Sequence, residues 1–246
     1  MRGKGHVSLH VEANGARGPR NGDRITATVS VADPSDPKND EKQVGAGQDK
    51  WNFAIILCVK RMFILAGANG SGKSTISKVL LPTEHVVYVN PDDVAKELNP
   101  CDPLAVRIEA GKETLRRVYG LLESGESFAI ESTLSGNMYV KVLQRARTLG
   151  YETTIAYVFV DSPEVCIARI AARVQNGGHF VPDEDVKRRY VRSKENFIRI
   201  YSSLVDHWML YYNGGTDIVL AAHGNGTLNV ILKERYAAFM EGACRN

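Results

Sequence analysis

GANGSGKST, residues 67–75, directly follows the apolar stretch 62–66 and decides the fold. It satisfies the pattern G-x-x-x-x-G-K-[ST] of a phosphate-binding loop (P-loop) between a strand and a helix. Glycines let a polyphosphate approach the main chain, whose N–H groups then receive its oxygens. We expect Lys73 to reach the β- and γ-phosphates and the Ser74 hydroxyl to face Mg²⁺. A glycine-rich turn without a ligand is the alternative, and the strand–loop–helix context argues against it.

The whole loop is expected to contact ATP. The predicted contacts are Gly67, Ala68, Asn69, Gly70, Ser71, Gly72, Lys73, Ser74 and Thr75. This motif indicates phosphate binding, but it is shared by kinases, ATPases, GTPases and transporter motors. The rest of the chain must therefore decide between these classes.

Composition is that of an ordinary globular protein, with 246 residues, 43% of them hydrophobic and 24% charged. The net charge of +3 favours neither a nucleic-acid partner nor a membrane surface. The apolar run 53–67 is interrupted by Lys60 and Arg61 and is too short to cross a bilayer.

Cysteine spacing gives no sign of a zinc site or a disulfide framework, because no two cysteines form a C-x-x-C pair. Reduced thiols of this kind favour a cytoplasmic location. The cysteines are Cys58, Cys101, Cys166 and Cys244.

Two regions differ in character along the chain. Residues 1–50 are rich in Gly, Asp, Asn, Pro and Lys, and we expect mostly disorder there. Residues 24–31 alternate like a strand, but we expect no partner for them. Residues 51–246 are expected to form one P-loop domain, with its core and its working start at Met62.

From Met62 onward strands and helices alternate, which predicts an α/β fold: a mostly parallel sheet with helices on both faces. The predicted strands are 62–66, 86–89, 127–131, 153–160 and 217–222. The predicted helices are 73–81, 92–98, 103–123, 138–148, 163–175, 183–203 and 230–241.

Carboxylates follow the second and third predicted strands, where open α/β sheets bind ligands. Asp92 or Asp93 could accept a proton from an attacking hydroxyl or help to hold a metal. Alternatively, Asp92 only caps the next helix. Glu131 could bond a substrate hydroxyl, while the Ser and Thr residues at 132, 133 and 135 fit ordinary turn and cap positions.

Asp161 closes the fourth strand and has two interpretations. It could hold Mg²⁺ through water, as the aspartate of a Walker B strand does. The following Ser-Pro-Glu, residues 162–164, instead makes Asp161 a helix cap, and we favour the cap.

Basic residues gather in the second half of the chain. Arg169 and Arg173 are four residues apart on one helix, a spacing that suits a triphosphate clamp. A glycine turn at 176–178 and Pro182 then lead into a basic helix. Such a flap could close over ATP and neutralise charge, although a solvated helix face explains many of the same cations. The helix carries Lys187, Arg188, Arg189 and Arg192.

Four segments in order resemble the zeta-toxin-like family of P-loop kinases: GANGSGKST, VNPDDVAKELNP, IESTLSG and RVQNGGHFVPDEDVKRRY. The resemblance covers about residues 62–213. It implies a kinase-like parallel sheet with a lid. The better-known members are toxins of toxin–antitoxin pairs that phosphorylate UDP-N-acetylglucosamine, which would give this chain a sugar-nucleotide substrate and an antitoxin partner.

The resemblance also assigns roles by position. Lys73 matches the phosphate-binding lysine, Ser74 the metal-side hydroxyl, Asp92 the base, Glu131 a substrate contact and Arg169 a lid arginine. The predicted catalytic residues are thus Asp92, Lys73, Arg169 and Arg173, with substrate contacts at Glu131, Thr133 and His179 and Mg²⁺ at Ser74.

This chain departs from the family at two places. His179 stands where the toxins have a second phosphate arginine before the lid proline, so Arg173 or Arg189 is expected to substitute for it. A nucleotide contact at residues 208–214 is in doubt, because this stretch lacks the family's aspartate and serine.

These features favour an ATP- and Mg²⁺-dependent small-molecule kinase that phosphorylates a hydroxyl. A switch or motor ATPase acting with protein partners is the alternative, but it needs a sensor element that the sequence does not show. An inactive nucleotide-binding protein is disfavoured by the intact P-loop.

Overall fold

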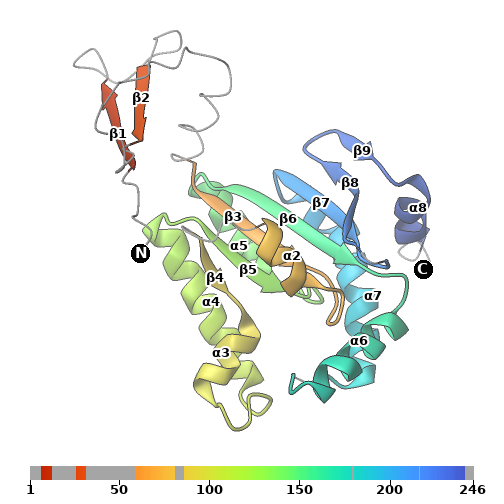
Figure 1. Cartoon of the computed structure of the whole chain (residues 1–246). Helices are drawn as coiled ribbons and strands as arrows, with labels where there is room; N and C mark the ends of the chain where they lie inside the picture. The colour runs from red at the N-terminus through yellow and green to blue at the C-terminus, as the bar shows by residue number, and fades with distance from the viewer. Residues whose placement is uncertain are drawn as a thin grey trace. The chain divides into compact units, whose positions relative to one another are not determined.

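The computed structural model describes residues 7–12, 26–31, 59–80, 86–178, 180–215 and 217–241. The chain divides into two compact units, Met1–Val59 and Lys60–Asn246. The second unit is built on a seven-stranded sheet in the order β4-β5-β3-β6-β7-β8-β9 (Figure 1). Its strands are β3 Arg61–Ala66, β4 Val87–Val89, β5 Phe128–Ser132, β6 Glu152–Phe159, β7 His207–Tyr212, β8 Val219–Gly224 and β9 Leu228–Val230.

Strand direction places the P-loop at the centre of the sheet. The strands from β4 to β7 are parallel, while β8 and β9 add antiparallel pairs at one side. β3 pairs with β5 on one side and β6 on the other, so the loop that follows it opens between the carboxyl ends of two neighbours. Ligands of open α/β sheets bind at such a point.

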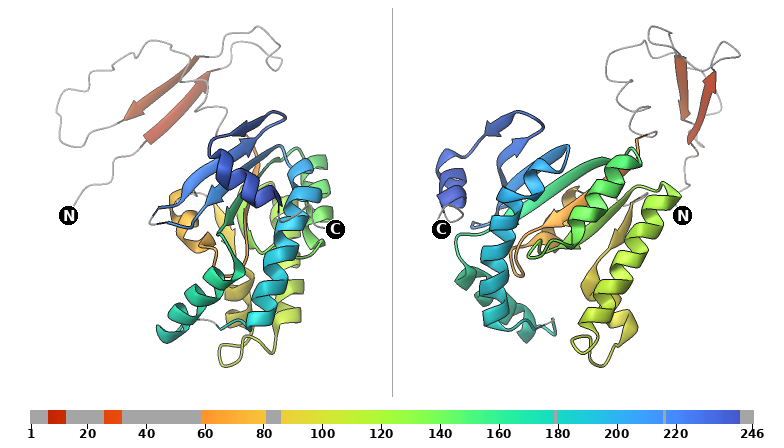
Figure 2. Two further views of the ribbon diagram at one scale, coloured as in Figure 1. Left: turned by 90° about the vertical axis from the view of Figure 1, so that its right-hand side faces the viewer. Right: turned by 180° about the vertical axis from the view of Figure 1, so that it is seen from behind.

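Helices cover both faces of this sheet, as Figure 2 shows from two further directions. The helices are α2 Lys73–Leu80, α3 Pro91–Leu98, α4 Arg107–Ser124, α5 Met138–Thr148, α6 Pro163–Gln175, α7 Asp183–Arg199 and α8 Lys233–Glu241, with a 3₁₀ turn at Tyr201–Ser203.

Alternate residues of the central strand serve the two faces. Met62 and Ile64 join the large core, to which α4, α5, α7 and α8 contribute. Leu65 points the other way and packs with Ile76 of α2. This is the period-2 pattern of a strand buried on both sides. The predicted α/β fold with a mostly parallel sheet is therefore confirmed.

Two strands of the second unit were not predicted. β7 pairs in parallel with β6 through six residues, from Thr154↔His207 to Phe159↔Tyr212. Its sequence, HWMLYY, has aromatic residues on both faces instead of a clean polar alternation. β9 is only three residues long. The helix predicted over 183–203 ends at Arg199, and the 3₁₀ turn replaces its last residues.

The first unit contains a paired strand that the sequence did not lead us to expect. β2, Thr26–Val31, runs antiparallel to β1, Val7–Glu12, with Val7 opposite Val31 and Glu12 opposite Thr26. The expectation that residues 24–31 have no partner is therefore wrong. The predicted disorder of residues 1–50 otherwise lies outside the described residues.

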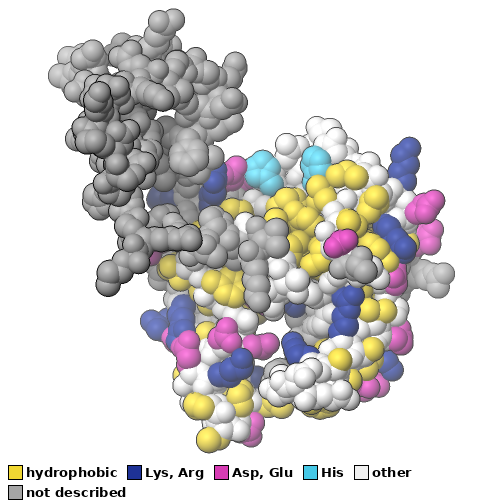
Figure 3. Space-filling model, in the orientation of Figure 1, with side chains coloured by type: hydrophobic (Ala, Val, Ile, Leu, Met, Phe, Trp, Pro, Cys, Tyr) yellow, Lys and Arg dark blue, Asp and Glu magenta, His cyan; other side chains and the backbone are white. Residues whose placement is uncertain are grey.

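Charged side chains on the face drawn in Figure 3 are mixed in sign. Among the described residues several charged side chains form local ion pairs, for example Arg116 with Glu113 at 2.7 Å and Arg117 with Glu97 at 2.6 Å. No helix among the described residues is long and apolar enough to cross a membrane.

Candidate active site

The loop between β3 and α2 adopts a conformation that requires glycine. Gly67 has φ +134° and Gly72 has φ +103°, values that L side chains rarely adopt. A Cβ at Gly67 would overlap the carbonyl oxygen of Val158, and one at Gly72 would overlap the side chain of Asn213. The loop is therefore held between the end of β6 and the residue that follows β7.

Lys73 lies across this loop. Its side chain is only 6% exposed, and Nζ donates to the carbonyl oxygens of Gly67 at 3.0 Å and Ala68 at 3.1 Å. These bonds hold the positive charge of Lys73 against the backbone of the loop. A phosphate anion that enters the loop would meet this charge and the backbone N–H groups of the loop.

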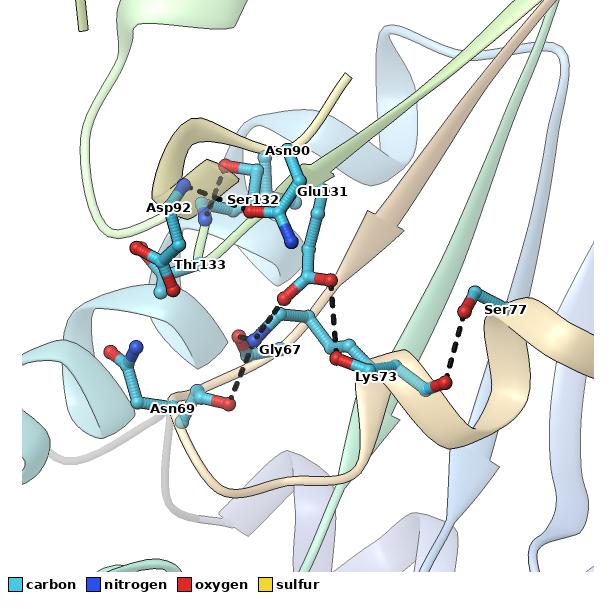
Figure 4. A network of polar contacts seen from close by, with 12 residues as sticks. Gly67, Asn69, Lys73, Ser77, Asn90, Asp92, Glu131, Ser132 and Thr133 are labelled. Atoms are coloured by element: carbon cyan, nitrogen blue, oxygen red, sulfur yellow. Dashed lines mark hydrogen bonds and ion pairs between the residues drawn. The ribbon is translucent and has the colours of Figure 1, made fainter. Parts of the chain in front are cut away.

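Glu131 completes the cluster from the end of β5 (Figure 4). Oε1 lies 3.6 Å from Lys73 Nζ. Oε2 accepts from Ser74 Oγ at 3.4 Å and from the Tyr88 hydroxyl at 2.6 Å. The carboxylate thus contacts the lysine and the hydroxyl predicted to bind phosphate and metal. Tyr88, on β4, was not predicted, because only its place in the sheet brings it to this cluster.

Asp92 stands at the start of α3, but it does not cap the helix. Asn90 is the N-cap: its Oδ1 accepts from the Asp92 backbone N–H at 2.9 Å, and Pro91 occupies the first turn. The capping alternative for Asp92 is therefore wrong. The Asp92 side chain is exposed, and it makes no ion pair or hydrogen bond with any residue in the described part of the chain.

A pocket of about 310 Å³ collects these groups at the carboxyl-terminal edge of the sheet. It unites the P-loop, the first turn of α3, the end of β5, one side of α6 and the residue after β7. Its lining residues are Asn69, Gly70, Gly72, Lys73, Ser74, Thr75, Asp92, Glu131, Arg169, Ile170, Arg173 and Asn213. All four predicted catalytic residues therefore share one pocket.

Arginines approach the pocket from two helices. Arg169 and Arg173 lie one turn apart on α6, and Arg169 Nη2 donates to the Asn213 carbonyl at 2.8 Å. Arg189, on α7, donates from Nη1 to Asn69 Oδ1 in the P-loop at 3.1 Å. α6 and α7 are joined to the loop by a small apolar cluster that includes Ala68, Cys166 and Val186.

Asn213 is a site residue that the sequence left in doubt. Its Nδ2 donates to the Ser71 carbonyl oxygen at 2.7 Å, and its backbone N–H donates to Phe159 at 2.9 Å. A predicted strand over 207–212 would have placed Asn213 at the ligand-binding edge of the sheet.

A protein-family model described as an AAA domain matches residues 62–194, more than half of the chain. The chain belongs to this AAA-domain family. An uncharacterised protein of Haemophilus influenzae is 35% identical over 139 residues, which are 56% of this chain and 93% of the relative.

Solved structures share the fold of this AAA-domain chain at low sequence identity. AvrRxo1-ORF1, solved in complex with AvrRxo1-ORF2 and sulphate ions, is 19% identical with a TM-score of 0.63; the match covers 76% of this chain and 65% of that one. A complex of the same pair solved with ATP gives 18% identity and a TM-score of 0.62, with coverage of 76% and 65%. This chain therefore spans just under two thirds of those chains.

A structure from the PezAT chromosomal toxin–antitoxin system of Streptococcus pneumoniae is 16% identical with a TM-score of 0.55, over 80% of this chain and 95% of that one. The predicted likeness to zeta toxins is thus confirmed for the fold. At this identity the comparison describes the fold alone: a P-loop, kinase-like α/β domain.

The remaining predicted substrate residues are less connected to the pocket. The Thr133 hydroxyl pairs with Ser135 Oγ at 2.9 Å in the loop after β5, and Thr133 does not line the pocket. That loop is held to the rest of the AAA-domain fold by bonds from Asn196 to Leu134 O at 2.8 Å and from Tyr201 to Gly136 O at 2.6 Å. His179 lies outside the described residues.

Asp161 neither caps α6 nor lies in the pocket beside the P-loop, the two roles considered for it from the sequence. Ser162, not Asp161, is the N-cap residue of α6, so the capping interpretation is wrong. Asp161 does not line the pocket of about 310 Å³ either. Its carboxylate instead accepts from the Tyr212 hydroxyl at 2.7 Å and from Arg235 Nη1 at 2.9 Å. It therefore ties β7 to α8.

The residues beside the P-loop suit Mg²⁺. Ser74 Oγ and Glu131 Oε2 lie 3.4 Å apart, and both are oxygen atoms of the kind that bind Mg²⁺ as ligands. Mg²⁺ is typically held by one or two protein oxygens together with substrate phosphates and water. No group of three or more metal-ligating side chains occurs among the residues that the structure describes, so an all-protein cage is not formed there.

Proposed function

We propose that this protein is an ATP-dependent kinase that transfers the γ-phosphate to a hydroxyl of a small molecule. The observation that carries the proposal is the Asp92 carboxylate, which lines the same pocket as Lys73 of the P-loop and has no protein partner among the described residues. A carboxylate in that state beside a phosphate site is suited to accept a proton.

The phosphate side of the pocket would be electropositive. Lys73 and the N-terminus of α2 face the same space, and Arg169 and Arg173 of α6 also line it. Charge on a transferring phosphoryl group is spread over its oxygens, and fixed cations stabilise it. Ser74 would hold Mg²⁺ at this site, and the ion would supply positive charge that neutralises part of the phosphate charge.

The acceptor hydroxyl would enter next to Asp92. Its oxygen attacks the γ-phosphorus, the bond to the β-phosphate oxygen breaks, and the hydroxyl proton passes to the Asp92 carboxylate. ADP leaves, and the acceptor gains one phosphate. Asn90 and Pro91 fix the start of α3, so they set where the carboxylate stands.

We propose a sugar nucleotide such as UDP-N-acetylglucosamine as the acceptor. The support is the resemblance to zeta toxins in the NPDD and ESTLSG segments, together with the fold shared with the PezAT protein. Glu131, near the end of β5, and Thr133, in the loop that follows it, stay predicted substrate contacts.

The direct test is a mass measurement. The full chain is incubated with Mg·ATP and a panel of sugar nucleotides, and each acceptor is examined for the mass of one added phosphate. A phosphorylated product supports the kinase. Rapid release of phosphate with no modified acceptor would instead favour the ATP-hydrolysing switch or motor.

A toxin–antitoxin role is a second part of the proposal. Proteins of similar fold were solved in the PezAT system and in the AvrRxo1-ORF1:AvrRxo1-ORF2 complex. The partner of this chain would be a protein that blocks the pocket beside the P-loop. Expression of the chain in bacteria should then arrest growth, while Asp92→Asn should not; equal growth of both strains would count against toxicity.

A further inference from the structure

The Tyr88 hydroxyl makes the shortest contact in the cluster around Glu131. It donates to Oε2 at 2.6 Å, whereas Ser74 Oγ lies at 3.4 Å from the same oxygen and Lys73 Nζ at 3.6 Å from Oε1. Short bonds to an ionised acceptor are the strong ones. Tyr88 therefore holds the carboxylate more tightly than either P-loop group does.

Strand register brings these side chains to one face of the sheet. Tyr88 is opposite Ala129 of β5, and Glu131 lies two residues farther along that strand. Residues two apart share a face, and a long side chain reaches a diagonal neighbour. Leu65, opposite Glu131 on β3, packs with Ile76 of α2 on the same face. Lys73 and Ser74 are the first two residues of α2, so the packing of α2 on this face brings them to Glu131.

The Tyr88 hydroxyl is the donor in its bond to Glu131 Oε2. A neutral hydroxyl next to a carboxylate directs its proton to the carboxylate oxygen. One lone pair of Oε2 is thereby occupied and the carboxylate plane is fixed.

We propose that Tyr88 is a positioning residue for Mg·ATP: it holds Glu131 against Ser74 and Lys73, so that Glu131 serves the metal side of the P-loop. The inference rests on the proposed ATP site and deepens it. It makes Glu131 an acceptor for the Ser74 hydroxyl or for water of the bound Mg²⁺, and it assigns a function to a tyrosine outside every motif of the sequence.

The test measures binding, not turnover. A non-hydrolysable ATP analogue is titrated into the full chain by calorimetry at a series of Mg²⁺ concentrations. Tyr88→Phe keeps the ring and removes the hydroxyl. We expect it to raise the Mg²⁺ concentration needed for half-maximal analogue affinity by about tenfold, the change expected when one hydrogen bond to a charged group is lost. An unchanged Mg²⁺ requirement would overturn the proposal.

Three further variants separate positioning from a general structural effect. Tyr211→Phe is the matched control, because its hydroxyl contacts only the Met209 sulfur, at 3.3 Å, among the described residues. It should leave the Mg²⁺ requirement unchanged. Glu131→Gln should raise the requirement, and adding Tyr88→Phe to it should change the requirement less than about twofold, because the two residues act as one unit.

Additive effects in the double variant would show that Tyr88 acts independently of Glu131, and would refute its positioning role. The outcome is separable from that of the kinase proposal, since no acceptor is present. If the wild-type chain binds the analogue with Mg²⁺ but phosphorylates no sugar nucleotide, the acceptor proposal fails and this one stands. If it shows no Mg²⁺-dependent binding, both fail.

Discussion

Arg189 of α7 donates a hydrogen bond to Asn69 of the P-loop across 3.1 Å. It is also 3.6 Å from the Asp185 carboxylate, one turn earlier on the same helix. The resemblance to zeta toxins led us to expect Arg173 or Arg189 in place of an arginine that these toxins have where this sequence has His179. Arg189 contacts the P-loop directly. This contact joins the basic helix to the phosphate site.

Arg189→Gln is expected to lower kcat for phosphoryl transfer by about 10- to 100-fold, because a cation near the transferring group is lost. Steady-state kinetics with ATP and the identified acceptor would measure it. Arg188→Gln is the matched control: Arg188 is 53% exposed and pairs with Asp185 at 2.7 Å. If the two substitutions change kcat equally, Arg189 has no role in phosphoryl transfer beyond that of a surface arginine on the same helix.

Asp92→Asn is expected to lower kcat at least about 100-fold while the affinity for ATP stays nearly constant, because the amide cannot accept the proton of the acceptor. Asp93→Asn serves as control, since Asp93 pairs with Lys96 at 3.2 Å on the exposed side of the same helix. Calorimetry of ATP binding and a product assay measure the two effects. Unchanged turnover in Asp92→Asn would refute its assignment as the base.

Gly67→Ala is expected to destabilise the protein by about 1–3 kcal/mol, because alanine would be forced to a positive φ and into contact with the Val158 carbonyl. Gly120→Ala, inside α4 with open space around it, should instead stabilise by about 0.5–1 kcal/mol. Chemical denaturation compares both variants with the wild type. If Gly67→Ala leaves the free energy of unfolding unchanged, the loop can relax around the alanine side chain.

Cys166 is expected to resist alkylation in the folded protein. It is fully buried, and burial raises its pKa to about 11. At pH 8 its thiolate fraction should be about 100-fold below that of an ordinary cysteine, and it should rise as the pH approaches 11. Mass spectrometry after iodoacetamide treatment should find exposed Cys101 modified and Cys166 unmodified. Similar rates at the two sites would show that α6 opens readily.

The sequence by itself determined the fold class and the phosphate site. The P-loop motif places glycine, lysine and serine within nine consecutive residues, and the alternation of strands and helices after Met62 follows from local periodicity. Strand ends also indicated Asp92 and Glu131, because the carboxyl ends of parallel strands meet at one edge. These signals lie within short stretches of chain, so they could be recognised without the fold.

Only the tertiary structure decided which groups meet there. Tyr88 reaches Glu131 through the register of β4 on β5, and Asn213 reaches Ser71 because β7 pairs beside β6. Arg189 contacts Asn69 across 120 residues of sequence. Asp161, suggested locally as a cap, instead binds Tyr212 and Arg235. Such contacts depend on strand order and helix packing, which bring together residues whose spacing in the chain carries no periodic signal.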